Sequence, residues 1–334
     1  MKAIQMKEFG GPEVLKYTEV PEPIPNKNEV LIRLYAAGVN PNETYIRTGT
    51  YSIVPELPYV PGFDGAGIVE ALGEGVKDLK VGDRVFVAAL ISNRNTGTYA
   101  EKVVCDEKAV HKLPGNIPFK EGAALGIPAL TAYRALFIRG KLKSGEIVLI
   151  HGASGGVGIL AVQMAKAAGA KVIGTASTEE GRKAIKALGA DYVINHVKED
   201  SIKEVLSLTE NKGPNLIIEF LANVNLETDL KIIAKGGAIV VVGNRGSLDF
   251  NPRLAMGKEA DIRGMILSNS TNEEYKESLE KLQEFLEKGL MHPLIGYEVK
   301  LEEAKEAHKL VSDKKGAGKI ILSINNYKKG SQIW

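Results

Sequence analysis

Hydrophobic and polar positions along the chain change their spacing most sharply near residue 150. The run Ile147–Ile150 is apolar and mostly β-branched, as in a buried strand. A glycine-rich segment, residues 151–158, follows it, and an apolar helical pattern then continues to Ala168. This order predicts a strand, a tight turn and a helix.

The same alternation of patterns continues toward the C-terminus. Strand-like runs come at Lys171–Ala176, Tyr192–His196, Leu216–Phe220, Ala238–Gly243 and Ile262–Leu267. Helical patterns separate most of them, at Glu179–Leu188, Ser201–Leu208 and Leu226–Ala234. Alternating strands and helices predict an α/β fold with a doubly wound parallel sheet, whose ligand crevice lies at the carboxyl ends of the strands.

Residues 1 to about 120 have a different pattern. Short β runs such as Val30–Tyr35, Gly67–Glu70 and Arg84–Ala88 are broken by proline and glycine. They predict a compact, mostly antiparallel β domain. A helical stretch around Glu121–Arg139 then leads into the central domain.

The C-terminal part predicts a return to the first domain. Helical patterns over about Glu273–Lys288 and Leu301–Val311 precede a strand-like run at Gly318–Ile324, and the segment from about Leu294 no longer extends the doubly wound sheet. We therefore expect a β domain over 1–123, a nucleotide-binding domain over 124–267, and helices with the returning segment over 268–324. The polar tail 325–334 is expected to be frayed or an expression remnant.

The glycine-rich turn is the first candidate for chemistry. A Gly-x-Gly-x-x-Gly fingerprint between a strand and a helix indicates dinucleotide binding, because the helix N-terminus faces the pyrophosphate. Here Ala153, which is small enough to keep the turn, takes the first position, and Gly155 and Gly158 follow. A glycine-rich turn without a ligand is the alternative. The predicted contacts are Ser154, Gly155, Gly156 and Val157.

Composition narrows the class of protein. The chain has 334 residues, 44% of them hydrophobic and 25% charged, which suits two globular domains. Its net charge of +2 is too small to indicate nucleic acid or an anionic membrane as a partner. The single cysteine, Cys105, allows no disulfide within the chain. With no targeting signal or membrane span in the pattern, these features predict a cytoplasmic protein.

Eight stretches in colinear order, from residue 1 to about 324, carry a family resemblance. They are Phe9–Leu15, Gly38–Tyr51, Val60–Gly62, Gly82–Phe86, Gly126–Leu136, His151–Gly158, Leu221–Leu226 and Val241–Gly246. Together they resemble the medium-chain dehydrogenases/reductases, in the zinc-free quinone oxidoreductase branch and its zeta-crystallin group. The resemblance implies a catalytic domain similar to GroES, a Rossmann domain, an active site in the cleft between them, and a homodimer or homotetramer.

No metal is expected. Zinc-dependent members of the family carry Gly-His-Glu after a Pro-Gly turn, whereas this chain has Pro61-Gly62-Phe63-Asp64, and Asn40 takes the position of a zinc-binding cysteine. A structural zinc site of four thiolates is excluded by the single cysteine. We interpret His151 as a core residue. No metal-ligand spacing connects the five histidines, His111, His151, His196, His292 and His308.

The end of the second strand of the doubly wound sheet predicts the cofactor. Enzymes that use NAD have a carboxylate there for the ribose hydroxyls. Here Val172–Ser177 ends without one, and Arg182 and Lys183 follow, while His196 ends the next strand. A hydroxyl group and cations suit a 2′-phosphate. A solvated helix face is the alternative for the two cations, and the resemblance implies NADPH, bound by Ser177 and His196.

Candidate substrate-binding residues lie on one loop of the first domain. Asn40, Tyr45 and Tyr51 offer an amide and two phenols that could hydrogen-bond a quinone oxygen, with rings that could stack on it. Half-buried packing is the alternative for both tyrosines. The resemblance implies that Asn40 and Tyr45 face the nicotinamide and substrate. It also implies cofactor contacts from Thr131, Asn225, Val242, Gly243, Asn244, Arg245, Met265, Ile266 and Leu267.

The sequence therefore predicts a metal-free, NADPH-dependent quinone reductase. Such a reaction needs little acid–base help, because the cofactor carries the reducing equivalents. Two alternatives stay open. One is reduction of an activated C=C bond in an enal or enoyl thioester. The other is a zeta-crystallin-like structural or AU-rich RNA-binding protein, which rests on the resemblance alone because no aromatic and basic RNA module is visible.

Overall fold

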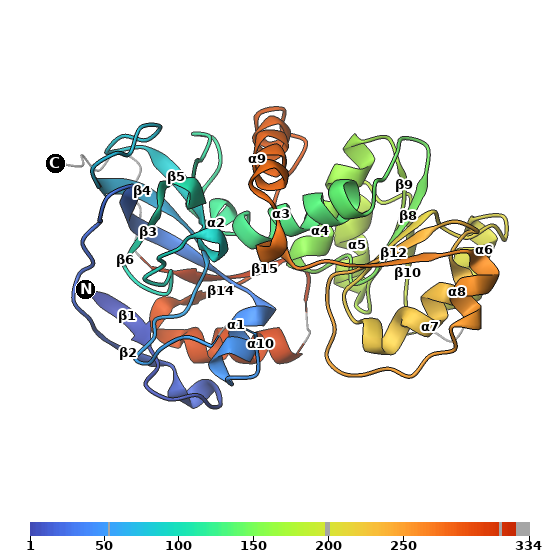
Figure 1. Cartoon of the computed structure of the whole chain (residues 1–334), viewed down its shortest axis with the longest axis horizontal. Helices are drawn as coiled ribbons and strands as arrows, with labels where there is room; N and C mark the ends of the chain where they lie inside the picture. The colour runs from blue at the N-terminus through green and yellow to red at the C-terminus, as the bar shows by residue number, and fades with distance from the viewer. Residues whose placement is uncertain (53, 198–200, 314–315, 325–334) are drawn as a thin grey trace. The chain divides into compact units, whose positions relative to one another are not determined.

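A computed structural model describes residues 1–52, 54–197, 201–313 and 316–324 (Figure 1). The chain forms two compact units, Met1–Ile127 with Pro293–Trp334, and Pro128–His292. The predicted tail 325–334 lies outside the described residues. Within the described part, no helix is long and apolar enough to cross a membrane.

The first unit contains a seven-stranded sheet with the order β14-β15-β3-β4-β5-β7, and β6 also pairs with β3. All of its described strand pairs are antiparallel except β14 with β15. This confirms the mostly antiparallel domain. The strands are β3 (Glu29–Val39), β4 (Asp64–Leu72), β5 (Arg84–Ala88), β6 (Lys102–Asp106), β7 (Val110–Lys112), β14 (Ile295–Lys300) and β15 (Lys319–Ser323). A separate pair joins β1 (Lys2–Gln5) and β2 (Lys16–Glu19).

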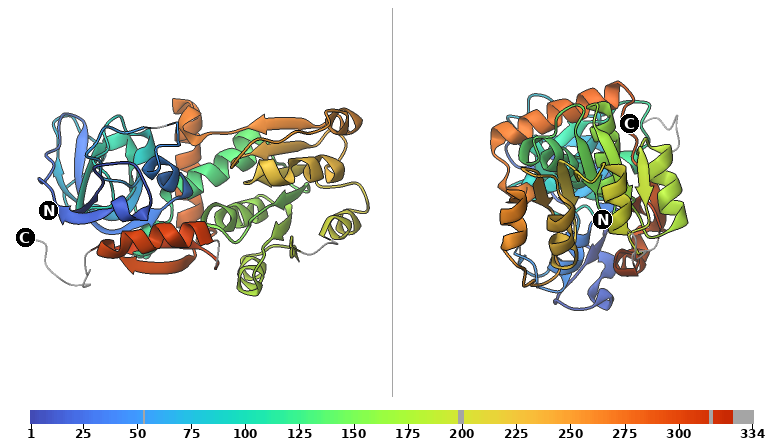
Figure 2. Two further views of the ribbon diagram at one scale, coloured as in Figure 1. Left: turned by 90° about the horizontal axis from the view of Figure 1, so that it is seen from below. Right: turned by 90° about the vertical axis from the view of Figure 1, so that its right-hand side faces the viewer.

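Alternate residues of the central strand β3 build the core of this unit. Val30, Ile32 and Leu34 pack with apolar residues of neighbouring strands and with the fully buried Cys105. Burial raises the pKa of the Cys105 thiol far above its usual range, which suits a packing role. The helices are α1 (Pro41–Arg47), α2 (Phe119–Gly122) and α10 (Ala304–Asp313). Helix α10 packs along β14 and β15 (Figure 2).

The second unit is built on a six-stranded parallel sheet with the order β10-β9-β8-β11-β12-β13. Its two halves run outward from the central pair β8 and β11, which is the topology of a doubly wound sheet. This confirms the predicted fold. The strands are β8 (Ile147–Ile150), β9 (Lys171–Thr175), β10 (Tyr192–Ile194), β11 (Leu216–Glu219), β12 (Ala238–Val241) and β13 (Asp261–Gly264).

Helices cover both faces of this sheet. Ile173 and Ile217 belong to one core cluster together with Leu230 of α7 (Ala222–Ile232). On the other face, a Cβ atom added to Gly174 would lie 3.0 Å from Ile185 of α5 (Glu179–Ala187). The remaining helices are α3 (Gly126–Tyr133), α4 (Gly156–Ala167), α6 (Ser201–Leu208), α8 (Arg253–Lys258) and α9 (Asn272–Glu287), and a π-helical turn spans Arg134–Arg139.

Helix α9 packs in the second unit, where Arg134 forms a 2.9 Å ion pair with Glu274, and the chain returns to the first unit at Pro293, next to the predicted Leu294. Helix α7 begins at Ala222, four residues before the predicted Leu226.

Candidate functional site

The glycine-rich turn connects β8 to α4 at the carboxyl edge of the parallel sheet. Gly152 has a φ of +50°, in the left-handed region that favours glycine. Ala153 is fully buried and its N–H donates to the carbonyl of Thr175, at 2.8 Å. The left-handed conformation therefore falls one residue before the first position of the predicted fingerprint, which explains why alanine is tolerated there.

The two later glycines have different surroundings. A Cβ atom added to Gly158 would lie 2.6 Å from the Cα atom of Ala153, so this glycine is required for close packing of α4 on the turn. A Cβ atom added to Gly155 would meet only the carbonyl oxygen of Gly152, at 3.4 Å. Gly155 is exposed and is the N-cap residue of α4. The protein's own packing therefore does not require a glycine at position 155.

The start of α4 presents the predicted pyrophosphate contacts. Gly156 and Val157 occupy its first two helical positions, where backbone N–H groups have no partner within the helix. Ser154 lies against α5, since a Cβ atom added to Gly181 would be 3.0 Å from the Ser154 hydroxyl. Backbone donors at the N-terminus of a twelve-residue helix make a suitable cradle for an anion.

The structure separates the two cations predicted to bind a 2′-phosphate. Arg182 donates from Nη1 to the carbonyl of Ser177, at 2.9 Å, so its guanidinium lies at the end of β9 beside that exposed serine. Lys183 instead forms a 2.7 Å ion pair with Glu179 on the exposed surface of α5. Lys183 thus matches the solvated-face alternative. His196 lies exposed just beyond β10, the strand next to β9.

Two segments, the start of α7 after β11 and the loop after β12, carry most of the other predicted cofactor contacts. Asn223 and the segment Asn244–Arg245 are joined reciprocally. The Asn223 N–H donates to the Asn244 side chain and the Arg245 N–H donates to the Asn223 side chain, both at 2.9 Å. Asn225 donates to Glu219, and the N–H groups of Val242 and Gly243 donate to the Glu219 carbonyl. Hydrogen bonds therefore join the start of α7, the end of β11 and the loop after β12 to one another.

The predicted residues beside the nicotinamide lie on α3 and after β13. Thr131 is buried on α3, and Met265 and Leu267 are buried beyond β13, with the exposed Ile266 between them. Arg134 connects these segments, because its Nη1 donates to the Ile266 carbonyl at 3.5 Å. The predicted contacts that follow strands β8 to β13 thus lie at the carboxyl edge of this sheet, whereas Thr131 lies on α3, one turn before Arg134.

In the first unit, Asn40 is the N-cap residue of α1, a helix that the sequence analysis interpreted as a loop. Asn-Pro followed by Glu43 is a capping-box pattern, so a signal for this helix was present in the sequence. Tyr45 lies on α1 and Tyr51 lies beyond it, and the centroids of their half-buried rings are 6.4 Å apart with the ring planes inclined by 29°. The structure brings the two tyrosines together as neighbours.

The Asn40 amide belongs to a buried polar network. Its Nδ2 donates to Asp64 at 2.9 Å and to Glu43 at 3.2 Å, and its Oδ1 accepts from the ammonium of Lys319. Lys319 also donates to Asp64, at 3.2 Å, and Tyr99 donates to Glu43, at 2.6 Å. Burial raises the pKa of Glu43 to about 7, although Lys319 acts to lower it. Asn40 therefore has no spare Nδ2 proton, and a direct bond from it to a quinone would require this network to rearrange.

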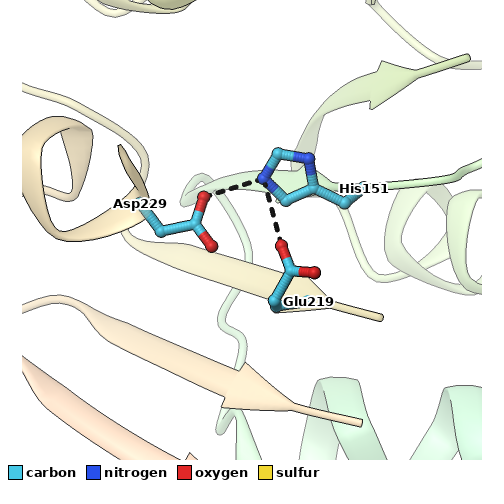
Figure 3. Close-up of side chains that lie close together, drawn as sticks. All are labelled: His151, Glu219 and Asp229. Atoms are coloured by element: carbon cyan, nitrogen blue, oxygen red, sulfur yellow. Dashed lines mark hydrogen bonds and ion pairs between the residues drawn. The ribbon is translucent and has the colours of Figure 1, made fainter. Parts of the chain in front are cut away.

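A second buried polar group lies at the end of β8, where the sequence analysis expected only a core histidine. His151 Nε2 lies 2.8 Å from Asp229 and 3.6 Å from Glu219 (Figure 3). Both carboxyl groups are fully buried. Burial lowers the pKa of His151, but Asp229 and Glu219 together outweigh it, so the net shift is upward. Residues 151, 219 and 229 are too far apart in the sequence for spacing to have predicted this cluster.

Comparison with known proteins identifies the family. A model of the alcohol dehydrogenase GroES-like domain matches residues 26–115, and one of the zinc-binding dehydrogenases matches residues 156–284. The quinone oxidoreductase of Homo sapiens is 48% identical over 324 residues, which cover 96% of this chain and 97% of that protein. The chain belongs to the quinone oxidoreductase branch of the medium-chain dehydrogenases/reductases.

Solved structures agree with this family. The quinone oxidoreductase of Escherichia coli, in complex with NADPH, superposes with a TM-score of 0.86 at 31% identity, covering 97% of this chain and 100% of that one. An NAD-dependent alcohol dehydrogenase superposes with a TM-score of 0.89 at 33% identity, with the same coverage. The resemblance seen in the sequence is confirmed.

The residues of this quinone oxidoreductase family member do not fit the zinc that one of the family models implies. Asn40 and Asp64 lie at the positions where we expect zinc ligands in relatives. Both side chains contact the ammonium of Lys319, so a cation of the protein itself already occupies the place of a metal ion. In the His151 cluster, the 2.8 Å contact to Asp229 is a direct hydrogen bond. Two ligand atoms of one tetrahedral zinc, each about 2.0–2.1 Å from the ion, would lie about 3.3 Å apart. The 2.8 Å between His151 and Asp229 is too short for such a pair of ligands.

We expect the purified protein to contain far less than one zinc per chain, and EDTA to leave its activity unchanged, because neither polar group offers an open set of metal ligands. Elemental analysis of protein purified without added metal, compared with its buffer, makes this measurement. Nearly one zinc per chain, or loss of activity on chelation that zinc restores, would contradict the metal-free assignment.

Proposed function

We propose that this protein is an NADPH-dependent quinone reductase that works without a metal ion. The observation that carries the proposal is the geometry of the second unit. A helix N-terminus with an open glycine at position 155 lies beside a strand end that has Arg182 and Ser177 but no carboxylate. The first feature suits a pyrophosphate and the second a 2′-phosphate. The relatives named quinone oxidoreductase support the choice of acceptor.

Each part of NADPH and the quinone is assigned its own set of residues. The N–H groups that begin α4 bind the pyrophosphate, and Arg182 with Ser177 binds the 2′-phosphate. Asn225 and the segment Val242–Arg245 close over the cofactor, and Thr131 with the residues after β13 lines the nicotinamide. Bound NADPH supplies the reducing equivalents. Tyr45 and Tyr51 orient the quinone through their rings and phenols, while Asn40 keeps the start of α1 in place.

The proposal extends to the setting of the enzyme. We infer a cytoplasmic homodimer or homotetramer. The single cysteine, Cys105, which allows no disulfide within the chain, supports a reducing compartment, and the family resemblance supports the oligomer. AU-rich RNA binding stays a prediction from the resemblance.

We expect quinones to be reduced with a kcat/KM at least about tenfold higher than that of activated alkenes, a difference of about 1.4 kcal/mol in activation free energy. The measurement is NADPH oxidation with 1,4-benzoquinone, 9,10-phenanthrenequinone, a medium-chain 2-enal and an enoyl thioester. Each acceptor is corrected for its direct reaction with NADPH. A higher kcat/KM for the enal or the thioester would favour the C=C reductase alternative.

A further inference from the structure

A buried carboxyl group lies at the topological switch point of the doubly wound sheet, where the order of the strands reverses. Glu219 is the last residue of β11 and is fully buried. Strands β8 and β11 are neighbours at the centre of the sheet, and the halves of the sheet extend from them in opposite directions. In sheets of this kind the ligand crevice lies outside the carboxyl ends at that point.

Glu219 is hydrogen-bonded to both segments that carry predicted cofactor contacts. Its carboxylate accepts from Asn225 Nδ2, which is 3.1 Å from each oxygen, and from the backbone N–H of Leu221. Its backbone carbonyl accepts from Val242 at 2.8 Å and from Gly243 at 3.3 Å. One residue therefore connects the start of α7 with the loop after β12.

Behind Glu219 lie the two ionisable groups that face it. His151 follows β8 and Asp229 lies on α7, and His151 Nε2 contacts a carboxyl oxygen of each (Figure 3). Burial raises the pKa of Glu219, His151 lowers it in part, and Asp229 raises it further. An ionised Glu219 can accept from Asn225 with both oxygens, whereas in a protonated one the oxygen that carries the proton is a donor and only a weak acceptor.

We propose that Glu219 is a positioning residue of the cofactor site, which fixes Asn225 and the Val242–Gly243 segment for NADPH and does so best when its carboxyl group is ionised. The inference rests on the proposed function, because it assigns a role toward NADPH. It adds a residue that contacts the cofactor only through other residues. The expected consequence is an affinity for NADPH that falls as the pH is lowered.

The test is the Kd of NADPH, measured by fluorescence titration between pH 6.5 and 9 for the wild type, Glu219→Gln and Glu227→Gln. Glu227 lies on the same helix α7 and forms an exposed ion pair with Lys231, so it is the matched control. We expect the wild type to bind about five- to tenfold more weakly at the low end of this range. Glu219→Gln should have that weak affinity throughout, and Glu227→Gln should follow the wild type. The 2′-phosphate of NADPH titrates in all three proteins, so their comparison isolates Glu219.

The outcomes separate the two proposals. A wild type that does not bind NADPH contradicts the proposed function. A wild type that binds, with the same Kd and pH profile in Glu219→Gln, overturns the role of Glu219 alone. If Glu219→Gln does not fold, Asn225→Ala serves in its place, because it removes the donor and should flatten the same pH profile. A metal ion that copurifies with the wild type and is lost in either variant would also overturn the inference.

Discussion

Replacing Gly155 with valine is expected to abolish NADPH binding while the fold survives. The backbone at Gly155 is extended, with φ −77° and ψ 170°, which valine adopts readily, and a Cβ atom there meets only one carbonyl oxygen at 3.4 Å. The branched side chain would occupy the space that the pyrophosphate needs. Losing two charge-assisted hydrogen bonds of about 1.5–3 kcal/mol each would weaken binding by at least about a hundredfold.

The controls come from other glycines of the chain. Gly115→Val is a matched substitution, since a Cβ atom at this exposed position meets nothing within 4 Å, and it should leave both the Tm and the NADPH affinity unchanged. Gly158→Ala should lower the Tm strongly, because its Cβ atom would lie 2.6 Å from Ala153. If Gly155→Val folds and binds NADPH with the wild-type Kd, the assignment of the pyrophosphate site is wrong.

Replacing Arg182 with alanine is expected to reduce the preference for NADPH over NADH by at least about tenfold. The guanidinium lies at the end of β9, next to the exposed Ser177, where a 2′-phosphate would bind. A charge-assisted contact to that phosphate contributes about 1.5–3 kcal/mol, which NADH does not gain. The measurement is the ratio of kcat/KM for the two cofactors at fixed ionic strength, with the same quinone.

Lys183→Ala is the matched control for Arg182. It removes a cation from the adjacent position of α5, but one whose ammonium is paired with Glu179 on the exposed surface. Its cofactor ratio should stay close to that of the wild type. Because a loss of general stability would affect both cofactors alike, only a changed ratio supports Arg182. Equal ratios in Arg182→Ala and Lys183→Ala would show that the 2′-phosphate binds elsewhere.

Much of the fold follows from local patterns in the sequence. The run Ile147–Ile150, the glycines after it and the apolar positions of α4 are contiguous, so the spacing of residues is sufficient to predict a strand, a turn and a helix. The same holds for the remaining strands of the parallel sheet, whose predicted ends differ from the observed ones by one to three residues. Helix α1 was not predicted, although Asn40 and Glu43 form a capping-box pattern at its start.

The candidate site is predictable only where its residues are neighbours in the sequence. The start of α4 is such a segment. Lys319 reaches Asn40 across 279 positions, and Asp229 reaches His151 across 78. Such contacts depend on which strands pair and on which faces they bury, and hydrophobic spacing does not encode them. The residues next to a charged side chain in the sequence do not indicate that it will be buried. Both polar networks could therefore be recognised only from the structure.

The most direct test of the central claim is the initial rate of quinone-dependent cofactor oxidation by the EDTA-treated wild-type protein. 9,10-Phenanthrenequinone is supplied with NADPH in one assay and with NADH at the same concentration in the other. We expect oxidation that requires both protein and quinone, is faster with NADPH than with NADH, and is unaffected by the chelator. No quinone-dependent oxidation of NADPH, a faster rate with NADH, or a rate that returns only on adding zinc would contradict it.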